Sequence, residues 1–201
     1  MLKILIMKIY LASKSPRRKE LLTQMGIEFE VLPIDIPEII HINESPNSYS
    51  KRITIEKLSA AWEKITQENF IIMPILCADT EVVLNNTILG KPNNYGEAFN
   101  MLKSYSGKNH KVITTIGLKY TNFEKISTNV TKVYFSEMND NEIHKYLQSG
   151  DYKDKSGSYG IQSYIGQFIN KIEGCFYSVM GLPLNAVREL LTEFHKFEQK
   201  R

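Results

Sequence analysis

The residues LASKSPRRKELL, at positions 11–22, mark the point where an apolar strand passes into a helix. Ser15 and Pro16 are residue types preferred at the N-cap and at the first position of a helix. Cations then occupy positions 17–19, in the first turn. The helix dipole places partial positive charge at this end, so each exposed cation costs about 0.3–1 kcal/mol there. The charge pattern therefore conflicts with the helix that it begins.

Two explanations of this conflict are open at the level of the sequence. A bound anion would remove it, because backbone N–H groups and guanidinium groups would then point at one phosphate. Local preferences are violated most often at functional sites, which favours this explanation. The alternative is a solvated basic turn with an ordinary helix cap.

Strands and helices alternate along the rest of the chain. Apolar runs and period-two patterns predict strands at positions 8–12, 27–31, 70–84, 87–89, 110–120 and 128–135. Apolar residues at helical spacing predict helices at positions 16–25, 47–67, 95–105, 137–148 and 184–197. Residues 151–174 are rich in glycine and aromatic side chains and match neither pattern. The alternation, with hairpins inserted, predicts an α/β fold with a mixed sheet.

Length and composition indicate one globular domain over residues 1–201, long enough to form two lobes. Hydrophobic residues make up 42% and charged residues 23% of the chain. The formal net charge of +3 suits small anionic ligands and is too small to indicate a nucleic-acid-binding surface. Cys77 and Cys175 lie far apart and have no CxxC partner. No disulfide framework or zinc site can be inferred from them, which favours a reducing compartment.

The N-terminal residues MLKILIMKIYLA are apolar, but Lys3 and Lys8 interrupt them. This stretch is too short to span a bilayer, and no small-residue cleavage site follows it. We therefore expect a buried strand and neither a membrane anchor nor a signal peptide. Met7 is a second candidate for the natural start, because MKIYLASKSPRR would still supply the strand.

An aspartate within an apolar strand provides a second candidate site. Asp79 lies in the segment IIMPILCADTEVVL, where an unpaired carboxylate would be costly. It must therefore either bond to a neighbouring backbone or serve as a base or a magnesium ligand. Lys91 returns close to it through the hairpin at positions 85–89. A buried aspartate and a lysine at one end of a sheet are what a metal–phosphate site requires.

The segment from Asp151 to Gln162 provides a third candidate. Gln162 follows the tripeptide Tyr159-Gly160-Ile161. Its amide has two donors and an acceptor, so it could recognise the edge of a nucleotide base. The same amide could instead satisfy the backbone of a bulged loop.

The common phosphate-binding and hydrolase motifs are not found in this sequence. GxxxxGK[ST], GxGxxG, GxSxG and HExxH do not occur. The histidines share no metal-ligand spacing and are expected to be structural or exposed: His41, His110, His144 and His195.

Five ordered motifs together resemble the Maf family of nucleoside-triphosphate pyrophosphatases. They are SKSPRRKELL at 13–22, ADTEVVL at 78–84, LGKP at 89–92, SGKNHKVIT at 106–114, and DKSGSYGIQ with SVMGLPL at 154–162 and 178–184. The resemblance covers nearly the whole chain from about Met7. It implies an elongated mixed α/β sheet flanked by helices, with two lobes and a cleft between them, similar to inosine-triphosphate pyrophosphatases. It also implies hydrolysis between the α- and β-phosphates with a divalent metal, Mg²⁺ or Mn²⁺.

The resemblance assigns roles to individual positions. Asp79 matches the family's proton acceptor. The polar, phosphate-side positions of the family are matched by Ser13, Arg18, Lys57 and Lys91. The positions that separate subgroups are matched by Arg17, Thr80 and Gln162. This combination is that of the subgroup acting on dTTP and UTP, whereas the subgroup preferring 7-methyl-GTP differs at all three.

One position departs from the family pattern. Members carry an acidic residue in the loop after the second strand, and Pro37 aligns with it here. The neighbouring Glu38 is our candidate for that role. The metal ligands implied by the resemblance are therefore Asp79 and Glu38.

The function implied is hydrolysis of dTTP and UTP, or of modified pyrimidine nucleotides, in the cytoplasm, clearing them from the nucleotide pool. Arg18 is expected to bind phosphates and Arg17 to help select the nucleotide. The family's link to septum formation leaves a second hypothesis open, a nucleotide-binding regulator of cell division with little turnover. No nucleic acid or membrane partner is expected. The resemblance allows a homodimer, although no residues mark its interface.

Overall fold

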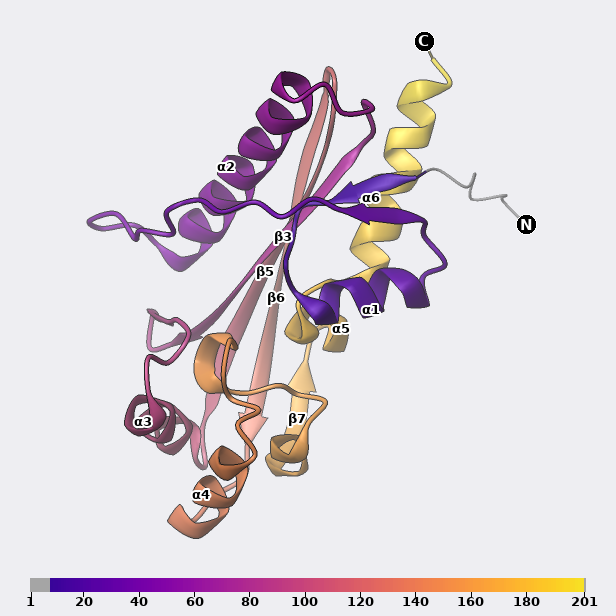
Figure 1. The fold of residues 1–201 in the computed structure, drawn as a ribbon. Coiled ribbons are helices and arrows are strands. Elements are labelled where there is room, and N and C mark those ends of the chain that lie inside the picture. The colour runs from indigo at the N-terminus through magenta and orange to yellow at the C-terminus, as the bar shows by residue number, and fades with distance from the viewer. Residues whose placement is uncertain (1–7, 201) are drawn as a thin grey trace.

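A seven-stranded mixed sheet forms the centre of the computed structural model, which describes residues 8–200 (Figure 1). The strands lie in the order β2-β1-β3-β5-β6-β7, and β4 pairs with β3. Their bounds are β1 Ile9–Leu11, β2 Phe29–Val31, β3 Ile75–Leu84, β4 Thr87–Leu89, β5 Asn109–Tyr120, β6 Phe123–Phe135 and β7 Ile169–Glu173. β1 is parallel to β2 and β3, whereas the other pairs are antiparallel. The predicted fold class, an elongated mixed sheet flanked by helices, is confirmed.

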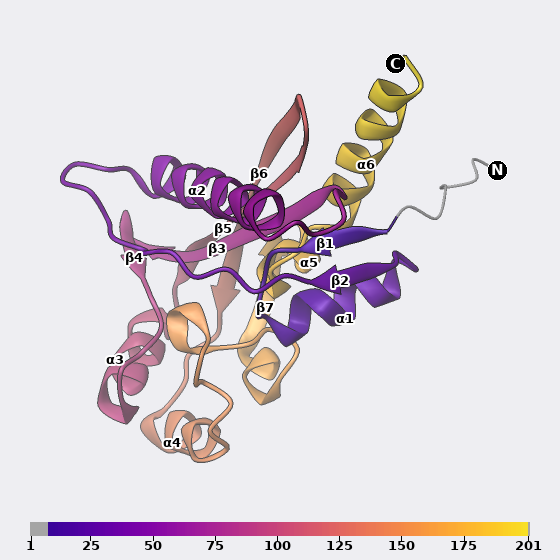
Figure 2. The same ribbon diagram turned by 45° about the horizontal axis from the view of Figure 1, so that its top comes forward.

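Helices cover both faces of this sheet (Figures 1 and 2). Their bounds are α1 Pro16–Gln24, α2 Pro46–Gln67, α3 Tyr95–Tyr105, α4 Asp140–Gln148, α5 Phe176–Met180 and α6 Leu184–Glu198. Two short 3₁₀ helices, η1 Ser156–Ser158 and η2 Tyr164–Phe168, occupy the segment that matched no pattern. The apolar stripe of α2 packs with Cys77 on one face of β3. Helices α1 and α6 pack with Ala78 on the opposite face.

A separate core forms where α3, α4, η1 and η2 cover the sheet. It contains Val82 of β3 with Tyr105 and Tyr146, which are fully buried. Ala78 and Val82 lie on the same face of β3 but belong to different cores. Thr80 lies between them on that face, because side chains of a strand alternate with a period of two. The boundary between the two cores therefore falls at Thr80.

The same part of β3 is open along one edge. β1 pairs with Ile75 and Leu76, and β4 pairs with residues 82–84. Within residues 8–200, positions 77–81 have a strand partner on one edge only, namely β5. A gap of this kind leaves backbone and side chains of β3 accessible from the side, and it positions the site described below.

Several predicted boundaries were wrong for local reasons. β3 begins at Ile75 and not at 70, because Pro74 has no N–H to donate to a ladder. β6 begins at Phe123 and not at 128, since its polar first residues pair fully with the end of β5. α4 begins at Asp140 and not at 137, where Asn139 forms a capping box with Glu142. The expectation for the apolar N-terminus falls largely on positions 1–7, outside the described residues; β1 occupies its last part.

Candidate active site

A cleft of about 690 Å³ opens at the unpaired edge of β3. Its walls come from the β1–α1 junction, the loop after β2, α2, β3, Lys91 just beyond β4, Val112 of β5, and residues 153–162 and 179–181. All nine of the residues predicted from the sequence line it: Ser13, Arg17, Arg18, Glu38, Lys57, Asp79, Thr80, Lys91 and Gln162. The structure therefore brings together side chains from six separate segments, while their roles stay predictions.

The N-terminus of α1 forms one wall of this cleft. Ser15 is the N-cap and Pro16 follows at the first position, as predicted. The Ser15 side chain makes no capping hydrogen bond, and its backbone N–H donates to Ser13 Oγ at 3.2 Å. No acidic side chain lies in the first turn. The positive end of the helix dipole is therefore not offset by the helix itself, which favours the anion-site explanation over the ordinary cap.

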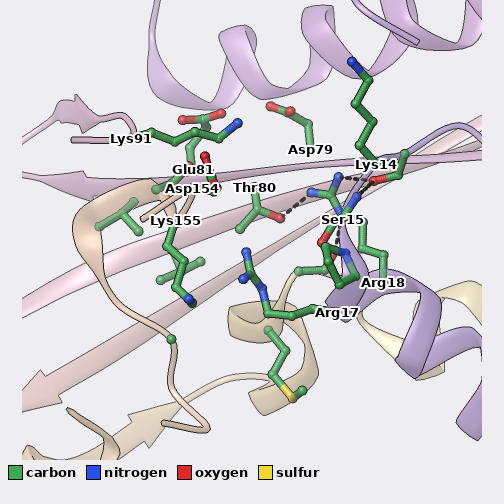
Figure 3. A pocket seen from close by; sticks show the side chains of 18 of the residues that line it. Lys14, Ser15, Arg17, Arg18, Asp79, Thr80, Glu81, Lys91, Asp154 and Lys155 are labelled. Carbon is green, nitrogen blue, oxygen red and sulfur yellow. Dashed lines mark hydrogen bonds between the residues drawn. The ribbon is translucent and has the colours of Figure 1, made fainter. Parts of the chain in front are cut away.

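Arg18 joins three segments of the cleft wall (Figure 3). Its guanidinium donates from Nε to the Gly181 carbonyl at 2.9 Å. It also donates from Nη1 to Ser13 Oγ and from Nη2 to Thr80 Oγ1, both at 3.1 Å. A guanidinium carries five N–H donors, so two are left for a ligand. Arg18 thus holds the wall together and retains the capacity to bind a phosphate.

Arg17 differs from Arg18 in having no hydrogen-bond partner among residues 8–200. Its side chain is partly buried and extends below Thr80 (Figure 3). Burial, with Arg18 as a neighbouring cation, lowers the pKa of Arg17. The guanidinium of Arg17 therefore has all of its donors available in the cleft.

The Thr80 hydroxyl belongs to an internal hydrogen-bond chain. Thr114 Oγ1 lies 2.8 Å from the Ser178 carbonyl and 3.1 Å from Thr80 Oγ1. A carbonyl oxygen only accepts hydrogen bonds, and a hydroxyl has one proton to donate. The Thr114 hydroxyl must therefore donate its proton to the Ser178 carbonyl. Thr80 then supplies the proton shared with Thr114 while it accepts from Arg18. Thr114 is fully buried and was not identified from the sequence.

Lys57 links two carboxylates on the opposite side of β3. Its Nζ lies 2.7 Å from Asp79 Oδ1 and 2.6 Å from Glu38 Oε1. Burial by itself lowers the pKa of Lys57, but Asp79 and Glu38 outweigh that effect and leave the pKa above its ordinary value. Asp79 is 4% exposed, and its Oδ2 has no hydrogen-bond partner in the described chain.

Glu81 is a further buried acid, and it was not among the residues predicted from the sequence. It is 6% exposed and rises from β3 on the same side as Asp79 (Figure 3). Burial, followed by the nearby Asp79 carboxylate, raises the pKa of Glu81 to about 9. The signal was present in the sequence, because an acid inside an apolar strand is as costly at position 81 as at position 79.

Lys91 and Gln162 enter the cleft from its other end. Lys91 is exposed, and Figure 3 shows its side chain reaching across from the β4 side toward Asp79. Gln162 is also exposed, and its amide has no hydrogen bond to another residue between positions 8 and 200. The alternative in which Gln162 satisfies a bulged backbone is therefore not supported.

The loop that carries Gln162 is held by two contacts that the sequence did not predict. Lys155 is 9% exposed, and its Nζ lies 2.7 Å from Asp151 Oδ1. Gly157 has a φ of +69°, and a Cβ there would lie 2.7 Å from Val82 Cγ2. Only glycine fits this position, so the loop packs directly on β3.

The chain is similar over most of its length to one protein family. The family model described as Maf-like protein matches residues 8–194. A Photobacterium profundum protein named dTTP/UTP pyrophosphatase is 45% identical over 179 residues, covering 88% of this chain and 91% of that protein. An Aliivibrio fischeri protein of the same name is 40% identical, covering 93% of this chain and 98% of its own length.

One match to a solved structure is more distant. The Staphylococcus aureus Ham1 protein aligns over 64% of this chain and 71% of its own, with 11% identity and a TM-score of 0.40. This likeness is too remote to bear on function. In the part of the chain that the structure describes, no helix is both long and apolar enough to cross a membrane.

Proposed function

Because this chain belongs to the Maf-like protein family, we propose that it is a nucleoside triphosphate pyrophosphatase that hydrolyses dTTP and UTP to the monophosphate and pyrophosphate. The relatives named dTTP/UTP pyrophosphatase match over 91% and 98% of their own length. Arg17, Thr80 and Gln162, the positions expected to select pyrimidine nucleotides, all line one cleft.

The observation that best supports this proposal is the distribution of acidic and basic side chains on the two sides of β3. Asp79 and Glu81 rise on one side of the strand, whereas Arg17 and Thr80 lie on the other (Figure 3). The N-terminus of α1 opens on the cationic side. A triphosphate requires cationic groups for its phosphates and an acid beside the reacting phosphorus. A cleft with one acidic and one basic wall supplies both.

The cationic wall is suited to hold the phosphates. The free guanidinium of Arg17 and the two unused N–H donors of Arg18 face ligand space on the cationic side, and the ammonium of Lys91 adds a further positive charge from the Asp79 side (Figure 3). Such charge-assisted bonds are about twice as strong as neutral ones. These residues orient the triphosphate so that its α-phosphorus lies near Asp79.

Asp79 is suited to act on the attacking water. Its Oδ1 is bound to Lys57, which leaves Oδ2 either to accept a proton or to hold a cation. Water attacks the α-phosphorus, its proton passes toward the Asp79 carboxylate, and pyrophosphate leaves. Lys57 orients the carboxylate and offsets its charge.

A divalent cation, Mg²⁺ or Mn²⁺, is part of the same proposal. The buried and unpartnered Asp79 Oδ2 is a hard oxygen donor of the kind these ions prefer. When bound, the cation supplies neutralisation of charge on the phosphate oxygens. Asp79 and Glu38 are the ligands that the family resemblance implies.

Small nucleotides, and no nucleic acid, are the partners that we propose. The cysteines at positions 77 and 175 are both unpaired, which agrees with a cytoplasmic enzyme. A homodimer is compatible with the same activity, because one chain contains every residue of the cleft.

Product identification tests the function. The purified protein is incubated with a panel of nucleoside triphosphates plus Mg²⁺ or Mn²⁺, and the products are separated by ion-exchange chromatography. We expect dTMP or UMP together with pyrophosphate. Release of orthophosphate would mean cleavage of a different bond. Nucleotide binding without turnover would favour the regulatory alternative.

A further inference from the structure

Glu81 is the one acidic side chain of the cleft's β3 wall for which the described chain provides no cation. Asp79 is bound to Lys57 through one oxygen, and Glu38 is bound to the same ammonium. Across the cleft, Asp35 pairs with Lys14. No lysine, arginine or histidine between positions 8 and 200 lies within ion-pair distance of Glu81.

The buried surroundings of Glu81 make a carboxyl group without a cation unfavourable in free energy. Its side chain is 6% exposed, on the same side of β3 as Asp79, whose Oδ2 is buried without a partner. Glu81 and Asp79 also share a side-chain hydrogen bond, and two buried acidic groups this close need either a proton or a cation between them. A residue chosen only to fill this place in the core would be apolar, as Val82 and Val83 are next to it.

We propose that Glu81 and Asp79 Oδ2 together bind the divalent cation, so that Glu81 takes the place expected for Glu38. This inference rests on the proposed function, since the cation serves the same triphosphate. Glu38 is less suited to the role, because its side chain is 45% exposed and its charge is already offset by Lys57.

Two protein carboxylates are enough for such a site. Mg²⁺ keeps several waters and usually takes one or two carboxylates plus phosphate oxygens of the substrate. No group of three or more histidine, cysteine, aspartate or glutamate side chains among residues 8–200 is arranged to hold a metal by itself. The two carboxylates at positions 79 and 81 therefore suit a cation whose coordination is completed by phosphate oxygens of the nucleotide.

The test is a titration of the nucleotide-free, full-length protein with Mn²⁺, with the free ion measured by electron paramagnetic resonance. Glu81→Gln keeps the shape of the side chain and removes its charge, and we expect it to weaken Mn²⁺ binding at least about tenfold. Asp35→Asn removes one charge from the same cleft at a side chain that is 80% exposed, and it should leave the affinity within about twofold. Equal affinity of Glu81→Gln and wild type would overturn the proposal.

Thermal melting separates a ligand role from a structural one. In metal-free buffer we expect Glu81→Gln to melt near the wild-type temperature, because the glutamine amide can donate to Asp79 the side-chain hydrogen bond that Glu81 makes there. Addition of Mn²⁺ should then raise the melting temperature of the wild type more than that of Glu81→Gln. If metal-free Glu81→Gln melted well below wild type, Glu81 would be structural.

The Mn²⁺ titration also compares the two candidate ligands. If Glu38→Gln weakened Mn²⁺ binding more than Glu81→Gln does, Glu38 would be the ligand and the proposal would be wrong. Neither readout depends on nucleotide turnover, so failure of the proposed function would be seen separately.

Discussion

Arg18 Nη2 donates to Thr80 Oγ1 across 3.1 Å, although the two residues lie 62 positions apart. This bond ties the N-terminal turn of α1 to the middle of β3. The Thr80 hydroxyl donates its proton to Thr114, so it has no proton left to donate to a ligand. Thr80 therefore affects a ligand through the space that it fills and through the residues to which it is bound. The nucleotide preference expected at Thr80 is therefore coupled to the placement of Arg18.

Replacing Arg18 by lysine should damage catalysis strongly. A single ammonium cannot reach Ser13, Thr80 and the Gly181 carbonyl at once, so at least two charge-assisted bonds are lost. At about 1.5–3 kcal/mol each, the loss predicts a fall in kcat/KM for dTTP of at least about 100-fold. Steady-state kinetics measure the fall in kcat/KM, and a thermal melt measures how much stability is lost with the hydrogen bonds.

Arg17→Lys is the matched control for Arg18→Lys. Arg17 has no hydrogen bond to the described chain, so its replacement should leave the melting temperature near that of wild type while KM for nucleotide rises. A larger drop in stability for Arg17→Lys than for Arg18→Lys would contradict the assigned division of roles.

Asp79→Asn should abolish turnover while nucleotide binding largely survives. The amide keeps the size of the side chain, and Lys57 still has Glu38 as a partner. What is lost is the carboxylate that accepts the proton or holds the cation. Turnover is measured by pyrophosphate release and binding by calorimetry.

Asp154→Asn provides the control for Asp79→Asn. Asp154 also lines the cleft, and its φ of +58° is a conformation that asparagine adopts readily. We expect this variant to turn over dTTP. Turnover like that of wild type in Asp79→Asn would remove Asp79 from the mechanism.

Gln162→Ala should lower turnover of dTTP and UTP more than that of other nucleotides. The Gln162 amide is free in the cleft, and loss of its bonds to a base costs about 1–3 kcal/mol. The ratio of kcat/KM between dTTP and GTP is the measurement. Gln167→Ala is the control, since that amide bonds to the Tyr164 carbonyl within η2 and does not line the cleft. Equal losses across all nucleotides would assign Gln162 a structural role.

Buried His110 should make the protein sensitive to mild acid. His110 is 2% exposed, bonds to Tyr159 at 2.7 Å and packs on Tyr105 and Phe135. Burial lowers its pKa to about 4, below the 6.5 of an unfolded chain. The unfolded state therefore binds the proton first as pH falls. The stability that His110 contributes is complete above pH 6.5 and is lost as pH falls through 4.

Urea unfolding at pH 7 and pH 5 measures the effect. Wild type should lose about 2 kcal/mol more than His110→Gln between these two values. His144→Gln changes an exposed histidine and should follow the wild-type pH dependence. If His110→Gln lost as much stability as wild type, other groups would govern the acid response.

Local sequence patterns determined most of the elements of this protein. The helix at 95–105 and the hairpin strand at 87–89 were predicted with the bounds that the structure has. The cations at positions 17–19 already indicated an anion site at the start of α1. The predicted bounds of this helix and this strand are confirmed because caps, glycine, proline and hydrophobic period act within a few residues of one another. No helix or strand was predicted within residues 151–174, because 3₁₀ turns and the short strand β7 depend on packing against distant elements.

The contacts that make the site were decided by the tertiary structure. Lys57 meets Asp79 because α2 packs on β3, and Arg18 meets Thr80 because β1 lies beside β3 in parallel. Glu81 lies in the part of β3 that the strand order leaves unpaired along one edge among residues 8–200. Such contacts join residues distant in sequence through sheet register and helix packing, which no local pattern specifies. The sequence alone therefore identified nine residues that line one cleft, and the fold determined which of them are bound to each other and which have no partner in the described chain.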